Sequence, residues 1–306
     1  MRMNPGLALT LTTVACWGVL PITLKVTLQG MDSVTITWYR FAGAFVMLST
    51  ILAVTGGLPT LHAFNRRIWL LLALAFVGLT GNYVLYLVGL SYTSPSVAQT
   101  VIQLAPMFFL LGGLIVFKER FSALQWIGFA VLLLGLALFF NRHLPELFTL
   151  STDTGLGVAL LVLAAILWAG YGLAQKQLTT HLGPQQILWL VYLGAVFVLL
   201  PASSPETVRA LNALEFWMLI FCCVNTLIAY TAFAEALKHW EASRIGAVLA
   251  VVPLLTLTSM WLVERFVPEL LVPEGLTAFN IIGALLVVSG SAMCALNPSS
   301  MKRSIP

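Results

Sequence analysis

Ten apolar stretches, each about as long as a membrane-spanning helix, follow one another along this chain of 306 residues. A hydrocarbon core of about 30 Å needs roughly 20 residues of helix to cross it. Only one charged residue, Arg40, falls inside any of the stretches. The sequence therefore predicts an all-α integral membrane protein with ten transmembrane helices. Their expected ranges are 5–24, 33–54, 68–90, 96–117, 121–140, 155–175, 185–202, 216–234, 245–263 and 276–296.

The composition removes several classes of protein. Charged residues make up 8% of the chain, against roughly 25% in a soluble domain, which excludes a soluble enzyme, a disordered chain and a nucleic-acid-binding protein. All four cysteines lie in apolar stretches, where a thiol behaves as a small hydrophobe. The sequence also lacks metal-ligand spacings and the H-E-x-x-H and G-x-S-x-G motifs. We therefore expect that the protein is not an enzyme and has no catalytic residue, cofactor, metal or nucleic-acid partner.

The positions of lysine and arginine predict how the chain lies across the bilayer. Cytoplasmic loops carry an excess of these residues. With the N-terminus in the cytoplasm, ten of them fall on the cytoplasmic side and four on the far side. Both termini are therefore expected to be cytoplasmic. The far-side residues are Lys25, Arg142, Arg209 and Arg265.

The chain contains an internal duplication, whose landmarks recur in the same order at offsets of 145 to 155 residues. They pair Trp17 with Trp168, Tyr83 with Tyr230, Pro106 with Pro253, Glu119 with Glu264, and Gly128 and Gly135 with Gly283 and Gly290. Five spans per copy turn the second copy over in the membrane, and inverted repeats place a substrate site where the copies meet. A short insertion in the second copy is expected at 266–275. The predicted units are a first repeat at 1–140, a linker at 141–154, a second repeat at 155–296 and a tail at 297–306.

Several short motifs keep their order along the chain. They are Trp17-Gly18, Arg40, Ala98 to Pro106, Glu119-Arg120 and Gln125-Trp126-Ile127-Gly128, followed in the second copy by Trp168, Pro253, Glu264-Arg265 and Ile281-Ile282-Gly283. Together they resemble the drug/metabolite transporter (DMT) superfamily, and within it the ten-helix EamA-type transporters, over nearly the whole chain. Lys118 and Val263 stand where that family usually has Gly before Glu-Arg, a departure that concerns the geometry of those two turns.

The resemblance implies a multi-pass protein of the bacterial inner membrane. It implies export of amino acids, related small polar metabolites or drugs, by alternating access through a cavity between the repeats. A multidrug or organic-cation exporter is the alternative, and a structural or sensory membrane protein is the rival outside transport. The expected partners are a small-molecule substrate and the lipid bilayer, and a homodimer is the assembly left open.

Polar and aromatic side chains inside the spans are the candidate substrate ligands, because no water reaches the bilayer core to satisfy them. Amides and aromatic rings suit a molecule with a polar head and a flat or apolar body. Each candidate also has an alternative in packing, since rings anchor bilayer interfaces and amides bond neighbouring helices. The candidates besides Arg40 are Trp17, Asn82, Tyr83, Tyr86, Gln99, Gln103, Trp168, Tyr171, Gln175, Asn225 and Tyr230, with Thr226 one turn from Tyr230.

Arg40 is the strongest single candidate for a functional residue. A cation inside a span is costly and by default indicates function. Its counterpart in the second copy is Val191, so the duplication does not require it. The functional interpretation is that Arg40 attracts a carboxylate of the substrate; the structural alternative is that it binds helix-end carbonyls or extends to the interface.

Four further residues are candidates for a gate or a hinge. Lys25 and Lys176 lie at opposite membrane faces, where they either snorkel to the interface or latch a gate. Pro106 and Pro253 each remove a backbone hydrogen bond, so matching kinks in the two copies suit a hinge. The ten predicted spans contain no acidic residue. We therefore expect substrate to move down its own gradient, with weak or no coupling to protons.

Overall fold

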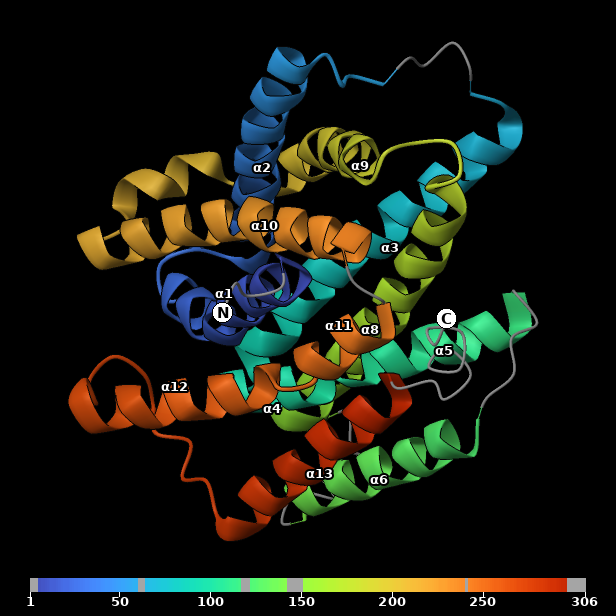
Figure 1. Cartoon of the computed structure of the whole chain (residues 1–306). Coiled ribbons are helices and arrows are strands. Elements are labelled where there is room, and N and C mark those ends of the chain that lie inside the picture. The colour runs from blue at the N-terminus through green and yellow to red at the C-terminus, as the bar shows by residue number, and fades with distance from the viewer. Residues whose placement is uncertain (1–4, 60–63, 117–121, 142–150, 240–241, 296–306) are drawn as a thin grey trace.

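The structure, a computed structural model, describes residues 5–59, 64–116, 122–141, 151–239 and 242–295, and within these ranges it contains helices and no strands. Figure 1 shows the helices packed side by side around a common centre. Two short 3₁₀ turns, η2 (Leu200–Ala202) and η3 (Pro205–Ala210), join α9 to α10. The α-helices are α1 (Pro5–Thr27), α2 (Ser33–Thr55), α3 (Arg66–Tyr92), α4 (Pro95–Val101), α5 (Leu104–Val116), α6 (Ala123–Phe139), α8 (Asp153–Leu178), α9 (Pro184–Leu199), α10 (Ala213–His239), α11 (Ala242–Leu249), α12 (Val252–Phe266) and α13 (Ala278–Ala295).

The described helices form ten spans when α4 is counted with α5 and α11 with α12, as the sequence predicts. Eight stretches are long and apolar enough to cross a bilayer, and α6 is a shorter apolar helix. The helix ends differ from the prediction, because α1 and α8 run about three residues further and include Lys25 and Lys176. Long lysine side chains can reach the interface from inside a helix, so their charge does not end it. The Glu119-Arg120 turn, most of the 141–154 linker and the 297–306 tail lie outside the described residues.

Local signals set several helix ends. Asp32 precedes α2 and accepts hydrogen bonds from the backbone amides of Val34 and Thr35, at 2.9 and 3.0 Å. Such a cap satisfies amides that have no partner in the first turn of a helix. Gly56 ends α2 in the left-handed conformation, with φ of 66°, which glycine adopts at little cost.

The two copies of the duplication cross in opposite directions. On α6 and α13, Gly128 lies against Gly290 and Gly135 lies against Gly283. A Cβ atom added at Gly128 would come within 2.8 Å of the Gly290 carbonyl oxygen, and one at Gly135 within 2.8 Å of the Gly283 carbonyl oxygen. The early glycine of one helix thus meets the late glycine of the other, so these equivalent helices are antiparallel. This is the arrangement expected of inverted repeats.

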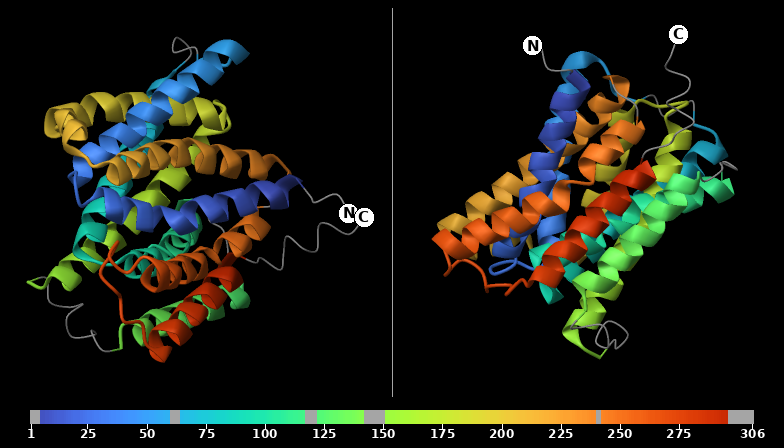
Figure 2. Two further views of the ribbon diagram at one scale, coloured as in Figure 1. Left: turned by 90° about the vertical axis from the view of Figure 1, so that its left-hand side faces the viewer. Right: turned by 60° about the horizontal axis from the view of Figure 1, so that its bottom comes forward.

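The remaining helix contacts follow the same pseudo-twofold relationship. Helix α1 packs on α10 as α8 packs on α3, and α5 packs on α8 as α12 packs on α1. The pairs α2 with α9 and α4 with α12 join equivalent spans directly. The views in Figure 2 show helices from the two halves of the chain interleaved throughout the bundle. The centre of the protein is therefore an interface between the two repeats.

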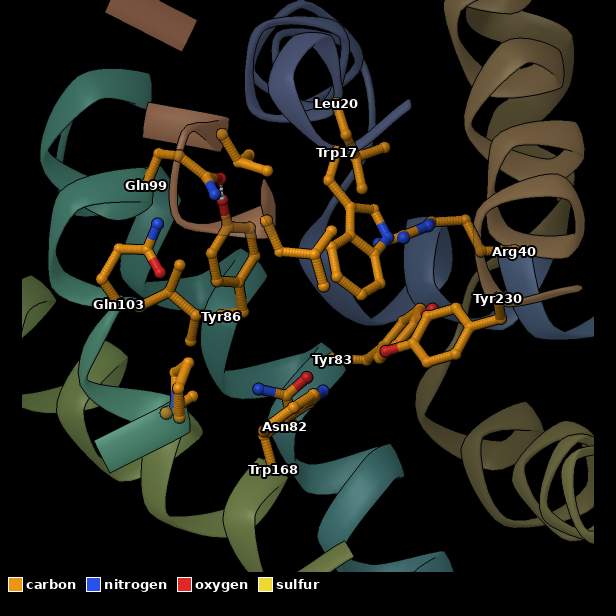
Figure 3. A pocket seen from close by; sticks show the side chains of 15 residues that line it. Trp17, Leu20, Arg40, Asn82, Tyr83, Tyr86, Gln99, Gln103, Trp168 and Tyr230 are labelled. Carbon is orange, nitrogen blue, oxygen red and sulfur yellow. Dashed lines mark hydrogen bonds between the residues drawn. The ribbon is translucent and has the colours of Figure 1, made fainter. Parts of the chain in front are cut away.

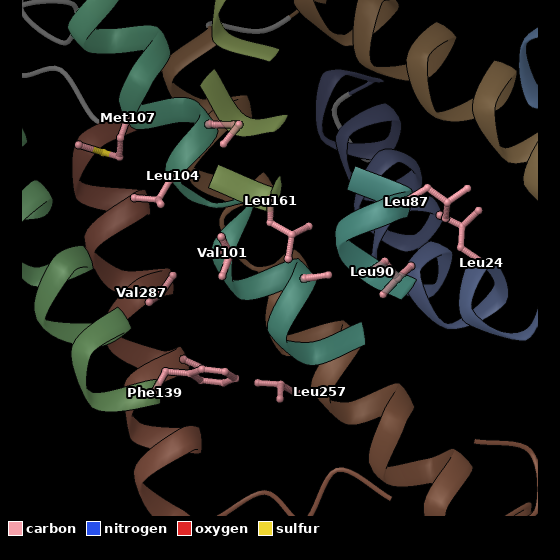
Figure 4. Close-up of a cluster of buried hydrophobic side chains, with 14 of the residues drawn as sticks. Leu24, Leu87, Leu90, Val101, Leu104, Met107, Phe139, Leu161, Leu257 and Val287 are labelled. Atoms are coloured by element: carbon pink, nitrogen blue, oxygen red, sulfur yellow. The ribbon is translucent and has the colours of Figure 1, made fainter. Parts of the chain in front are cut away.

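An apolar cluster fills the bundle at the end where α1, α3 and α12 finish and α4 and α8 begin, which we call the Lys25 end. Leu24, Leu90 and Leu161 are fully buried there, and Leu257 is nearly so. Figure 4 shows these side chains on separate helices, with Leu24 close to Leu90 and Leu257 close to Phe139. Their packing buries apolar surface and fills this end of the bundle.

Candidate functional site

A cavity of about 160 Å³ lies at the centre of the bundle, between the two repeats. Figure 3 shows aromatic rings and amides from several helices facing one another around it. The described residues that line it include no aspartate or glutamate. They are Trp17, Leu20, Arg40, Asn82, Tyr83, Tyr86, Gln99, Ile102, Gln103, Ala105, Pro106, Trp168, Tyr230, Leu249 and Val252.

Two helix interruptions border the cavity. One separates α4 from α5, just before Pro106, and the other separates α11 from α12, just before Pro253. Proline has no amide hydrogen to donate to the preceding turn, so an interruption at these places is expected. The side-chain amide of Gln103 donates a hydrogen bond to the Ala250 carbonyl oxygen, 3.3 Å away. The interruption of one repeat is thereby bonded to that of the other, while a hinge role for Pro106 and Pro253 stays a prediction.

Matched aromatic residues of the two repeats form the walls. Trp17 and Trp168 both line the cavity, as do Tyr83 and Tyr230. The ring centroids of Trp17 and Tyr230 are 5.6 Å apart in an edge-on arrangement, and those of Tyr83 and Tyr230 are 6.1 Å apart. Aromatic pairs at such distances favour edge-to-face or offset packing. The duplication thus supplies both halves of one aromatic lining.

Arg40 is 3% exposed and reaches the cavity from α2. Its Nε atom donates a hydrogen bond to the Thr226 hydroxyl at 3.1 Å, and its guanidinium carbon lies 4.4 Å from the centre of the Tyr83 ring. The Tyr83 face offers a cation–π contact that is stronger when water is excluded. No hydrogen bond joins either Nη atom to the described residues, so that edge of the guanidinium remains for a bound molecule. This position excludes the alternative in which Arg40 extends to the bilayer interface.

Further polar side chains line the cavity beside Arg40, among them Asn82, Tyr86, Gln99 and Gln103. The Asn82 amide donates to the Ala164 carbonyl at 2.9 Å, and the Tyr86 hydroxyl donates to Gln99 Oε1 at 3.4 Å. Each of these bonds uses only part of the capacity of the amide, because an amide carries two donors and an acceptor. The Asn82 and Gln103 oxygens and the Gln99 amino group are therefore left for a polar ligand.

The polar lining comes almost entirely from the first repeat. At the 147-residue offset that relates Tyr83 to Tyr230, the counterparts of Asn82, Gln99 and Gln103 are Ala229, Gly246 and Ala250. The second repeat contributes Trp168, Tyr230, Leu249 and Val252 to the wall. The cavity is consequently polar on one side and aromatic or apolar on the other.

Three predicted ligands lie away from the cavity. Asn225 is 2% exposed and donates to the Cys16 carbonyl at 2.8 Å, which ties α10 to α1. Tyr171 is buried in the apolar packing between α3, α8 and α9. Gln175 lies partly exposed, near the end of α8. Such a position suits helix packing for Asn225 and Tyr171, the alternative that the sequence had left open for amides and aromatic residues.

The predicted gate residues occupy opposite ends of the bundle. Lys25 donates to carbonyl oxygens at the end of α3, and Lys176 is exposed near the end of α8. The start of α3 marks the Lys176 end, since Arg67 donates to Gln177 there. Pro253 is buried at the start of α12 beside the cavity residue Val252, whereas Pro106 itself lines the cavity.

The sequence singled out Thr226 by its spacing from Tyr230, and the structure shows it bonded to Arg40. Five apolar residues of the cavity lining carry no comparable signal. The apolar lining residues could have been found only by their nearness to other candidates along the chain. They are Leu20, Ile102, Ala105, Leu249 and Val252.

Comparison with known proteins agrees with this architecture. The chain matches the EamA-like transporter family twice, over residues 4–141 and 155–296. It is 39% identical to the Escherichia coli (strain K12) protein named "Uncharacterized inner membrane transporter YhbE" over 292 residues, which are 95% of this chain and 91% of the relative. It is 38% identical to an "Uncharacterized transporter" of Haemophilus influenzae over 298 residues, 97% of either chain.

A solved crystal structure shares the fold, with a TM-score of 0.65 and 14% identity over 99% of both chains. The two family matches cover the same two halves that the duplicated landmarks delimit. Ten helical spans in two antiparallel copies around a central cavity agree with that assignment. The chain therefore belongs to the EamA-like transporter family.

Proposed function

We propose that this transporter moves small polar metabolites that carry a carboxylate, such as amino acids or related compounds, out of the cell by alternating access through the central cavity. The observation that carries this proposal is the open edge of the Arg40 guanidinium, in a lining whose described residues contain no acid. The export direction rests on the family resemblance. The bacterial inner membrane is the proposed location, as the name of the YhbE relative indicates for that protein.

The electrostatics of Arg40 favour an anionic group. A buried cation without a counter-charge is costly, and a substrate carboxylate would supply the missing charge. The guanidinium presents parallel donors that match a carboxylate in geometry. Thr226 and Tyr83 occupy one side of the group, which leaves its other side for the substrate.

The size and asymmetry of the cavity favour a small molecule with a polar head. Sites for drug-sized ligands typically enclose about 300–1,000 Å³, well above the 160 Å³ present here. The carboxylate and any amino group would face the polar side formed by Arg40, Asn82, Gln99 and Gln103. The body of the molecule would face Trp168 and Tyr230 of the second repeat.

An organic-cation exporter is the second candidate, because aromatic rings attract cations. Trp17, Trp168 and Tyr230 would provide such faces. Arg40 counts against it, since a positive substrate would be repelled at short range in a water-poor site. The two proposals therefore differ in the charge of the molecule that is carried.

The test is counterflow in proteoliposomes with compounds matched in shape but not in charge. An amino acid, its amide and the corresponding decarboxylated amine differ mainly in the carboxylate. We expect the amino acid to exchange and the amine not to exchange. Arg40→Gln should lower exchange at least tenfold, because leaving out one partner of a buried charge pair costs about 2–5 kcal/mol.

Arg209→Gln, in the connection before α10, is the matched control and should exchange normally. Thermal stability measured on all variants separates loss of folding from loss of binding. A folded Arg40→Gln protein with unchanged exchange would remove the carboxylate proposal. Faster exchange of the amine than of the amino acid would favour the organic-cation alternative.

A further inference from the structure

The connection between α12 and α13 folds back against the Lys25 end of the bundle. This is the segment in which the sequence indicates an insertion. Glu274 Oε1 accepts a hydrogen bond from the Ser96 backbone amide at 3.1 Å, at the start of α4. The Glu274 amide in turn donates to Glu264 Oε1 at 2.7 Å, at the end of α12. Glu274 thus bonds α4 through its side chain and α12 through its backbone amide.

Lys25 closes the same end from another side. Its ammonium donates to the carbonyl oxygens of Leu90, Ser91 and Thr93, at 2.8, 3.1 and 2.6 Å. The Leu90 carbonyl also accepts from the Thr93 amide at 3.3 Å, and carbonyls at a helix end have free bonding capacity because the helix finishes there. A cation at a helix C-terminus is also favoured by the helix dipole. Lys25 therefore fastens the end of α1 to the end of α3.

Two buried polar atoms of this closure are left without hydrogen-bond partners among the described residues. Glu274 Oε2 and Ser96 Oγ are both buried and unbonded among the described residues. Ser96 is only 1% exposed. A buried carboxylate oxygen without a partner is costly, whereas a protonated carboxyl group carries no charge and can donate to a hydroxyl. A proton on Glu274 would remove the buried charge and give the carboxyl group a hydrogen to donate.

A second cavity, of about 330 Å³, adjoins Glu274. It provides room for water when the carboxyl group ionises. It also gives protons a short route to the group. Its lining residues include Tyr92, Ser94, Val97, Phe140, Glu274 and Asn280.

The charged and titratable neighbours of Glu274 come from three helices. Glu264 of α12 is a like charge that disfavours ionisation, and Tyr92 of α3 lines the second cavity. Lys25 of α1 lies within electrostatic reach but is bonded to the α3 carbonyls. Burial raises the pKa of the Glu274 carboxyl above its usual range. The nearby hydroxyl and amide of Ser96 and the hydroxyl of Ser94 act in the opposite direction and only weaken that rise.

We propose that Glu274 is a proton-binding site and that the proton bound there holds the Lys25 end of the transporter shut. Opening exposes the carboxyl group to water and returns it to an ordinary acidity. A group that is less acidic in the closed form stabilises that form below its closed-state pKa, and this stabilisation is lost as the pH rises through it. The proton binds and leaves on the same side of the membrane, so it regulates opening without being transported.

The experiment measures whether the closed end becomes accessible as the pH rises. A cysteine is placed at Ala98, which is fully buried beside the closure, in a protein whose four native cysteines are replaced. Its maleimide labelling rate in full-length protein in liposomes is divided by that of a cysteine at Val272, which is 86% exposed in the same connection. The ratio removes the pH dependence that the two thiols share, and the same buried thiol in the Glu274→Gln protein controls for any that remains.

We expect this ratio to rise at least tenfold between pH 5 and pH 9. Glu274→Gln, a permanently neutral side chain of the same shape, should keep the ratio low at every pH. Lys25→Met should raise the ratio at low pH, because it removes three bonds from the closure. Glu269→Gln, an exposed acid in the same connection, should behave like the parent protein.

Two results would overturn the proposal. One is a ratio that stays constant across the pH range in the parent protein. The other is a Glu274→Gln protein that keeps the pH response or is labelled rapidly throughout. None of these measurements uses a substrate, so their outcome does not depend on whether the carboxylate proposal is correct.

Discussion

The Nε atom of Arg40 and the hydroxyl oxygen of Thr226 lie 3.1 Å apart, and the arginine is the donor. The hydroxyl donates its own hydrogen to the Cys222 carbonyl oxygen, 2.8 Å away on the preceding turn of α10. The Thr226 hydroxyl therefore accepts one hydrogen bond and donates another, and its orientation is fixed. Thr226 holds the arginine by its Nε atom and leaves the two Nη atoms for the cavity.

Replacing Thr226 with valine keeps the shape of the side chain and removes the bond to Arg40. We expect the KM for a carboxylate substrate to rise about tenfold, since a hydrogen bond to a charged group contributes about 1.5–3 kcal/mol. The maximal exchange rate should change less, because the arginine itself is still present. Concentration-dependent exchange in proteoliposomes measures the two quantities separately.

The conservative variant Thr226→Ser is the control for this prediction. It retains a hydroxyl and should keep the KM within about threefold of the parent value. A role for Thr226 in packing alone would instead make valine the milder change. Equal KM values for the valine variant and the parent protein would show that Arg40 needs no such support.

The interruption before Pro253 should affect turnover more than binding. Pro253→Ala restores an amide that can donate to the Leu249 carbonyl and join α11 to α12 in one helix. A continuous helix cannot bend at this place, so we expect slower exchange with substrate affinity within about threefold of the parent. Exchange rates and equilibrium binding on the same protein provide the two values.

Pro184→Ala is the matched control, because Pro184 begins α9 at a place where no helix is interrupted. It should leave both measurements unchanged. An unchanged exchange rate in Pro253→Ala would mean that this interruption serves packing and not motion. A loss of affinity without slower exchange would point to a role in shaping the cavity wall.

The antiparallel contact of α6 and α13 predicts where side-chain volume is not tolerated. A Cβ atom at Gly135 would lie 2.6 Å from the Val287 amide nitrogen, which belongs to the backbone and cannot rotate away. We expect Gly135→Leu to destabilise the protein by about 1–3 kcal/mol or more, because overpacking forces the helices apart. Thermal unfolding in detergent measures the difference.

Gly170 provides the comparison, since a Cβ atom there would have nothing within 4 Å. Gly170→Ala should be neutral or slightly stabilising, because alanine favours a helix by up to about 1 kcal/mol over glycine. Similar losses of stability at the two positions would show that helix propensity, and not the close contact, controls the result.

The general arrangement of the fold could be predicted because membrane-spanning helices can be recognised from their length and apolar composition. The landmarks Trp17 with Trp168 and Tyr83 with Tyr230 also indicated which residues meet at the centre, since equivalent positions of inverted repeats approach a common axis. Helix ends were less certain from the sequence. A lysine such as Lys25 can belong to a helix whose apolar part has already ended.

The sequence alone does not predict the environment of each amide side chain. Asn82 and Asn225 look alike along the chain, yet Asn82 borders the cavity and Asn225 bonds the Cys16 carbonyl in a helix contact. Which side of a helix meets which neighbour depends on its rotation, and periodicity alone does not set that. Nor could the burial of the Glu274 carboxyl group be predicted, because Glu274 lies in an insertion without a helical pattern.

The absence of acidic residues from the described cavity lining predicts that substrate movement is not driven by protons. A pH difference of one unit imposed across a liposome should leave the steady-state distribution of a zwitterionic substrate unchanged. One-for-one exchange with protons would produce a gradient of about tenfold, because one pH unit is a tenfold ratio of proton concentration. The rate of approach is still expected to vary with pH if Glu274 controls the Lys25 end. An accumulation that follows the imposed gradient, and that Glu274→Gln abolishes, would show that this proton crosses the membrane with the substrate instead of returning to the side from which it came.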